Sequence, residues 1–146
     1  MTINLITKGN AKVGALSVST DLQVGDDIYV AGHMGNYIAV SNITDGASMA
    51  ITAAQLLNGI VTATPTTGRT VAAPAAADII AAVTPATATG TGFEFTVINL
   101  AGATHALTLG VATGTTIVGS VTIAAATSAT FVARIASGTT VVIYRK

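Results

Sequence analysis

The sequence predicts a mostly β-strand fold, an antiparallel β-sandwich or jelly-roll-like unit with one or two short helices. Apolar stretches recur roughly every 8–12 residues between turn residues in the C-terminal part, which is the spacing of sandwiches and barrels. Within them apolar and polar residues alternate: Phe93 and Phe95 share one face, and Glu94 points the other way. The chain has 146 residues and no cysteine, so a hydrophobic core rather than disulfide bonds must hold it together.

Residues 1 to about 50 are predicted to form a β-meander, and residues from about 51 to 146 the β-sandwich body. Turn-forming residues at 24–27 and 32–36 separate the apolar stretches of the meander. No composition shift divides the chain, so residues 1–146 are expected to form a single domain. The predicted strands of the meander are Ala15–Leu22, Asp27–Ala31 and Tyr37–Thr44.

Two short helices are expected in the body. Thr52 followed three residues later by Gln55 forms a capping box, and Gly59 is a typical stop signal, which predicts a helix over about 52–58. Pro74 suits a first helical turn, and the alanine-rich residues after it favour a second helix over about 74–83.

Seven further stretches of the body are predicted to be strands. Their period-two alternation places one set of large apolar side chains in the core: Phe93, Phe95, Val97, Ile117, Val121, Ile123, Phe131 and Ile135. The predicted strands are Ile60–Thr64, Arg69–Ala72, Phe93–Leu100, Ala106–Val111, Thr115–Ala124, Ala129–Ala136 and Thr139–Arg145.

Charge is sparse along the whole chain. Charged residues make up 8% of the sequence and the net charge is zero, whereas about a quarter of the residues in ordinary soluble domains are charged. A neutral chain lacks the electrostatic attraction that nucleic acid or an anionic membrane would require, so neither is an expected partner. An apolar-leaning surface with so few charges favours association, and we expect a closed homo-oligomer.

The mean hydropathy of +0.70 requires a test for membrane segments. The longest apolar run, Val71–Val83, is interrupted by Pro74 and Asp78 and is shorter than the ~20 residues of a spanning helix. Lys8 and Lys12 lie where a secretory signal would need its apolar stretch, so no export signal is expected.

The residue patterns predict no catalytic, cofactor or metal site. His33 and His105 lie far apart, and neither has a second ligand at metal-binding spacing. The pair Asp26-Asp27 is expected to form a turn rather than bind calcium, because the surrounding residues do not match a calcium loop. Glu94, the only glutamate, is expected to be an exposed cross-strand partner of Arg134 or Arg145.

The order of several elements between Ile51 and Arg145 resembles small structural proteins of tailed bacteriophages, particularly head decoration or cement proteins. The resemblance implies a sandwich or jelly-roll-like homotrimer on the outer capsid surface of the virion, where it contacts the major capsid protein and stabilises the head. No catalytic residue comes with it. The segments that carry it are Thr52–Ile60, Gly68–Val71, the alanine-rich helix after Pro74, Gly90–Asn99 and Ile117–Val121.

The first fifty residues fall outside this resemblance and carry half of the chain's formal charges. Because charged residues at an interface set orientation and partner choice, this region is the candidate docking surface. The alternative is a phage receptor-binding or fibre-tip module that recognises host glycans, although glycan sites usually use aromatic platforms and this chain has three Phe, three Tyr and no Trp. The candidate docking residues are Lys8, Lys12, Asp21, Asp26 and Asp27, with Asp45 as the sixth charge.

Overall fold

Two β-sheets and two short helices make up the described part of the computed structural model, which covers residues 38–83 and 89–146. Sheet A contains β1 (Ala39–Ile43), β3 (Gly59–Ala63), β5 (Gly92–Asn99), β7 (Thr115–Val118), β9 (Thr127–Ser137) and β10 (Thr140–Arg145). Sheet B contains β2 (Met49–Ala50), β4 (Arg69–Ala72), β6 (Leu107–Gly110) and β8 (Thr122–Ile123). The strand orders are β1-β3-β5-β9-β10-β7 and β2-β4-β6-β8.

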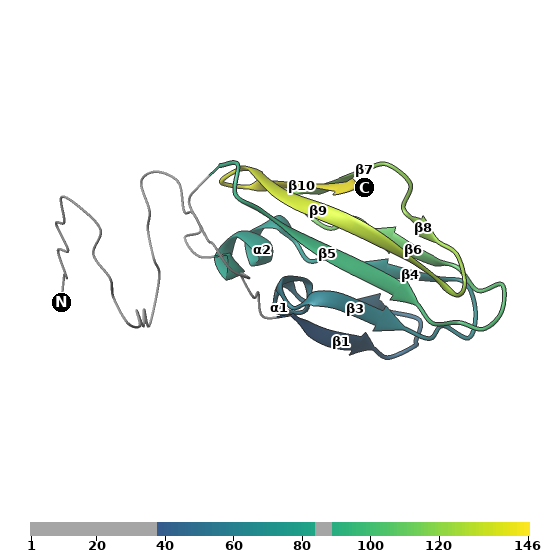
Figure 1. Ribbon diagram of the computed structural model, residues 1–146. Coiled ribbons are helices and arrows are strands. Elements are labelled where there is room, and N and C mark those ends of the chain that lie inside the picture. The colour runs from purple at the N-terminus through teal and green to yellow at the C-terminus, as the bar shows by residue number, and fades with distance from the viewer. Residues whose placement is uncertain (1–37, 84–88) are drawn as a thin grey trace, which may run out of the picture. The chain divides into compact units, whose positions relative to one another are not determined.

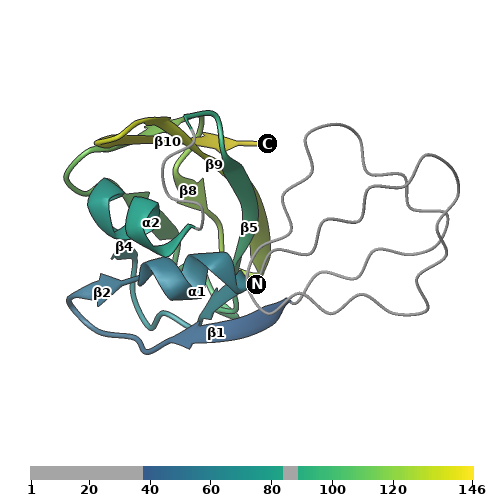
Figure 2. The same cartoon turned by 90° about the vertical axis from the view of Figure 1, so that its left-hand side faces the viewer.

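The sheets lie face to face, and the predicted mostly-β fold with two short helices is confirmed. In Figure 1 the long strands β5 and β9 of sheet A lie in front of β4, β6 and β8 of sheet B. The helices α1 (Ala53–Leu57) and α2 (Ala76–Ala82) lie together at one end of the sandwich, where Figure 2 shows them in front of the space between the sheets. Their apolar residues Leu56 and Ile79 belong to the core.

The predicted caps of the first helix are present. Gln55 N–H donates to Thr52 Oγ1 at 3.3 Å, and Thr52 N–H donates to Gln55 Oε1 at 2.9 Å, so both halves of the capping box form. The helix ends before Gly59, whose φ of +91° is strained for any residue with a side chain. The second helix is one to two residues shorter at each end than predicted and has no side-chain cap.

The sheets are mixed rather than antiparallel. From β1 to β8 each strand is followed by a strand of the opposite sheet, so neighbours within one sheet are separated by a crossing to the other and back. Four pairs separated by such a crossing are parallel (β1–β3, β3–β5, β2–β4 and β4–β6), whereas β6–β8 is antiparallel. With β7–β10, five of the eight strand pairs among the described residues are parallel. The jelly-roll alternative finds no support in this topology.

The predicted strand Thr115–Ala124 is two strands in two different sheets. Thr115–Val118 is β7, which pairs with β10 in sheet A, and Thr122–Ile123 is β8, which pairs with β6 in sheet B. Gly119 separates them with a φ of +101°, and a Cβ there would lie 3.0 Å from the Cβ of Arg145. Since alternation continues on both sides of Gly119, the sequence pattern did not reveal the break.

The sandwich body also begins earlier than about residue 51. Strand β1 pairs with β3, and the short strand β2, which the sequence did not predict, pairs with β4. The body therefore extends back at least to Ala39.

The core lies between the two sheets and is centred on two phenylalanines. Phe95 and Phe131 stack with ring centroids 5.4 Å apart, and both are fully buried. Five of the eight predicted core residues are buried, Phe93 and Ile117 pack partly buried against the core, and Val121 is half-buried. The five buried residues are Phe95, Val97, Ile123, Phe131 and Ile135.

Asn99, the last residue of β5, joins the two sheets through a fully buried amide. Its Nδ2 group donates to the carbonyl oxygen of His105 at 2.8 Å and to that of Ile123, in β8, at 3.0 Å. Its Oδ1 accepts the N–H of Ala101 at 3.0 Å. The amide thus satisfies three backbone groups that the sheet ladders leave free, which is the requirement for burying them.

Replacing Asn99 by alanine is expected to lower the free energy of unfolding by about 3 kcal/mol, because two carbonyls and one N–H lose their partner in a buried place. Guanidinium unfolding measures the loss. The matched control is Asn42→Ala, which removes an exposed amide that accepts one hydrogen bond from Thr62 and should cost about 1 kcal/mol or less. Equal losses in the two variants would contradict the assignment of Asn99 as the link between the sheets.

Candidate functional site

The side of sheet A that faces away from the core carries several exposed apolar side chains that the described residues leave uncovered. Sheet B and both helices lie against the other side of the sheet (Figure 2). Val40 is 65% exposed, Val118 52% and Tyr144 38%, and all three point to this outer side. The outer face of sheet A consists of Val40, Asn42, Ile60, Thr62, Glu94, Thr96, Ile98, Thr116, Val118, Ser128, Thr130, Val132, Arg134, Val142 and Tyr144.

One carboxylate and one ammonium group at this face neutralise each other. Lys146 Nζ lies 2.6 Å from Glu94 Oε2, and both side chains are more than half exposed, so the pair adds little stability. The expected partner of Glu94, Arg134 or Arg145, is therefore wrong. Arg145 instead donates to the carbonyl oxygens of Ser120 and Thr122 and lies over the Phe131 ring.

The sequence did not single out the outer face, although one signal was present. Residues 141–144 read Val-Val-Ile-Tyr, so the strand has apolar side chains at both phases of the two-residue repeat. A strand of that kind is apolar on both of its faces, which is typical of strands covered on two sides. Val118 directly after Ile117 shows the same feature in β7.

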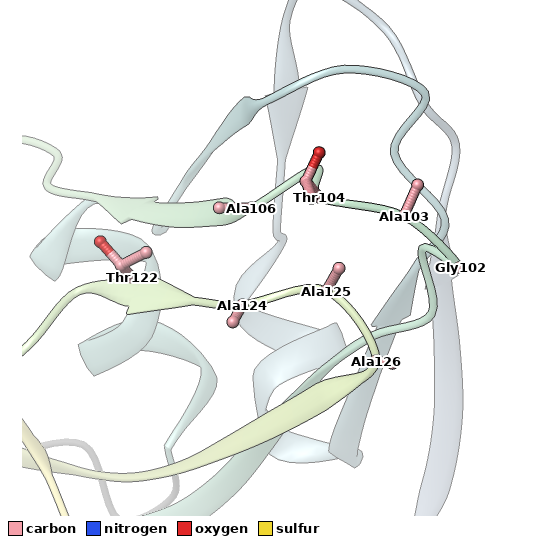
Figure 3. A pocket seen from close by; sticks show the side chains of 8 residues that line it. All are labelled: Gly102, Ala103, Thr104, Ala106, Thr122, Ala124, Ala125 and Ala126. Carbon is pink, nitrogen blue, oxygen red and sulfur yellow. The ribbon is translucent and has the colours of Figure 1, made fainter.

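Two grooves open on the described surface. One, of about 540 Å³, lies between the β5–β6 and β8–β9 connections, and Figure 3 shows its short side chains. Its lining has methyl and hydroxyl groups but no ionisable side chain: Gly102, Ala103, Thr104, Ala106, Thr122, Ala124, Ala125 and Ala126. The other, of about 660 Å³, lies beside the starts of β3 and β5 and has one ionisable group, Glu94, which is paired with Lys146.

Asp45 belongs to a partly exposed polar cluster of the sandwich body. Its Oδ1 lies 2.8 Å from Arg69 Nε, and its Oδ2 accepts hydrogen bonds from the N–H and the hydroxyl of Thr66. These hydrogen bonds, with that from Arg69 first, lower the pKa of Asp45 from 3.8 to about 2. The cluster fastens the connection after β1 to the start of β4, so Asp45 has a structural role.

The other predicted docking residues, Lys8, Lys12, Asp21, Asp26 and Asp27, lie outside the described residues, as does His33. His105 lies in the connection before β6, where its backbone bonds to Asn99 and Ala103. Among residues 38–83 and 89–146 no group of three or more His, Cys, Asp or Glu side chains could hold a metal ion. Within the same ranges no helix has the length and apolar character needed to cross a membrane.

No protein-family model, curated protein or solved structure matches this chain. The site is therefore described by its surface alone, a sheet face with few charges and several exposed apolar side chains.

Acid is expected to weaken the Asp45 cluster. Since the folded pKa is below the usual 3.8, the stabilisation is complete above that value and is lost as pH falls toward about 2. Asp45→Asn should be less stable than the wild type near about pH 6, and the difference should shrink as the pH approaches 2. Denaturant unfolding at a series of pH values measures it. Arg69→Gln should cost less in the Asp45→Asn background than alone, and strict additivity would show that the two residues do not interact.

Proposed function

We propose that this protein is a virion structural protein, a decoration or cement protein that binds the outer surface of a capsid as a homo-oligomer and stabilises the head. The observation that carries the assembly part of the proposal is the outer face of sheet A, which exposes Val40, Val118 and Tyr144 among threonines and serines. The capsid part rests on the resemblance of residues 51–145 to phage head decoration proteins.

The chemistry of this face suits permanent contact with other protein. Burial of apolar surface contributes about 25 cal/mol for each Å² removed from water. Hydroxyl groups of residues such as Thr96 and Thr130, which already bond to each other at 3.1 Å, can pair without the large cost of stripping water from a charge. Such a surface suits a lattice in which every copy has the same neighbours.

Head stabilisation follows from selective binding. A protein that contacts several capsid subunits at once binds the assembled shell and not the separated subunits. By mass action it then shifts the equilibrium toward the shell, and the shift grows with its concentration relative to Kd. No catalytic group is needed for this activity.

The alternative, recognition of host glycans, has less support from the described surface. The groove between the β5–β6 and β8–β9 connections has no aromatic side chain. The groove beside β3 and β5 contains Phe93 and Phe95, but Phe95 is 1% exposed and Phe93 packs against the core. In this groove one ring is therefore buried and the other only partly exposed, whereas a sugar stacks on an open aromatic face.

Capsids that lack the protein should bind it in co-sedimentation, and its addition should raise the temperature at which they release their genome. Removal of residues 1–12, which include Lys8 and Lys12, should leave a folded oligomer that no longer binds, because the N-terminal charges are the proposed docking groups. Wild-type occupancy by the truncated protein would place the docking surface elsewhere. Failure of the full-length protein to bind capsids, together with binding on a glycan array, would replace the proposal with the alternative.

A further inference from the structure

Sheet A ends in two edge strands that have no protective residues. Within the described residues β1 pairs only with β3, and β7 pairs only with β10. Natural proteins usually protect such edges with charged side chains, proline or bulges, because an open edge can pair with another strand. Strands β1 (Ala-Val-Ser-Asn-Ile) and β7 (Thr-Thr-Ile-Val) contain none of these residues.

The two edges also carry the most exposed large apolar side chains found within any described strand. These are Val40 of β1, 65% exposed, and Val118 of β7, 52% exposed. Both side chains lie on the outer face of sheet A, so a continuous sheet that joined the two edges would bring them to the same side.

The backbone groups left free on the two edges are in phase with each other. Ala39 N–H donates to Asn58 O at 2.7 Å, and by the alternation of a parallel ladder the N–H and C=O groups of Val40 and Asn42 then point away from β3. Val141 N–H donates to Gly114 O at 3.0 Å, which by the same rule leaves the N–H and C=O groups of Ile117 pointing away from β10.

A parallel register satisfies these groups on both edges. With Val40 opposite Thr116 of a second copy, the Val40 N–H meets the Thr115 carbonyl and the Val40 carbonyl meets the Ile117 N–H. Two residues further along, Asn42 lies opposite Val118, and the Asn42 N–H meets the Ile117 carbonyl. The outer-face side chains of both strands then lie on one side of the extended sheet.

Strand direction permits this joint, and the exposed β7 edge favours it over a two-fold one. Strand β5 is antiparallel to β9, β9 is antiparallel to β10, and β1, β3 and β5 are parallel, as are β10 and β7. Both edges therefore run in the same direction, as a parallel head-to-tail joint requires. A two-fold β1–β1 joint would be antiparallel and would leave Val118 exposed.

We propose that copies of this chain join head to tail through sheet A, with β1 of one copy paired in parallel with β7 of the next. The occupant is a second copy because both complementary edges belong to the same chain and its zero net charge removes repulsion between copies. A head-to-tail contact of this kind closes into a ring when its rotation permits. The inference rests on the proposed structural role, for which it supplies the subunit contact.

Three variants of the full chain test the joint by light scattering. Val40→Pro removes the outward N–H of β1 but no bond to β3, a position at which an edge strand tolerates proline. Val118→Lys places a charge on the β7 edge. The control, Ser128→Lys, adds the same charge to the same face on β9, an interior strand. If circular dichroism shows that Val40→Pro does not fold, Val40→Lys replaces it.

The wild type and Ser128→Lys are expected to be oligomers, and each edge variant alone should fall to the mass of one subunit. An equimolar mixture of the two edge variants should form a two-subunit complex, because one variant keeps an intact β7 and the other an intact β1.

Several outcomes would overturn the joint: edge variants with wild-type mass, a mixture that stays monomeric, or Val118→Lys that still self-associates through a β1–β1 contact. A monomeric wild type would mean that another segment or partner covers the edges, which also overturns it. Capsid binding in the same samples separates the two claims. If the wild type binds capsids while any of these outcomes holds, only the joint fails; if it does not bind, the proposed function fails as well.

Discussion

The crossing of the chain from one sheet to the other after each strand from β1 to β8 is the constraint on which the rest of this structure depends. The crossings from sheet A to sheet B are short, such as residues 44–48 and 64–68, whereas the first two returns pass through α1 and α2. Parallel neighbours require a crossover connection, and here the opposite sheet together with a helix provides it. The helices are thereby held at one end of the sandwich. Strand β9, antiparallel to both β5 and β10, is the described strand of sheet A that runs in the opposite direction, and β10 pairs with β7 at the far edge.

Polar side chains hold the sandwich together where the chain leaves sheet A. A strand that ends must find new partners for its last backbone groups, since burying them unpaired is costly. Asp45 follows β1 and bonds to Arg69 at the start of β4, and Asn99 ends β5 and bonds to Ile123 in β8. Both contacts join a crossing to sheet B, so the few polar groups near the core are used to fix one sheet against the other. No described buried side-chain nitrogen or oxygen lacks a hydrogen-bond partner.

Local signals in the sequence were sufficient for most elements and insufficient for the way in which they combine. The capping box at Thr52 and the run Arg69–Ala72 predicted their elements closely because a cap and a two-residue alternation are local. Pairing direction depends on the crossings, which no local pattern encodes, so the sheets were expected to be antiparallel. Gly119 looked like one more residue of a strand because its neighbours kept the alternation. The candidate surface was missed for a related reason: Val40 and Val118 have significance only once β1 and β7 are known to be edges.

Most of the described charges are used within the chain itself. Asp45 pairs with Arg69, Glu94 pairs with Lys146, and Arg145 binds two backbone carbonyls. Within the described residues this leaves Asp78 and Arg134 as the charged side chains without a hydrogen bond or ion pair. Glu94 and Lys146 already neutralise each other but remain more than half exposed, so an interface that covered them would still have to remove their water, whereas one built on the apolar and hydroxyl side chains of the sheet would avoid that cost. In the proposed joint, orientation would therefore come from the fixed spacing of backbone donors and acceptors at the edges of β1 and β7 and from the side chains of the outer face, both of which are the same in every copy.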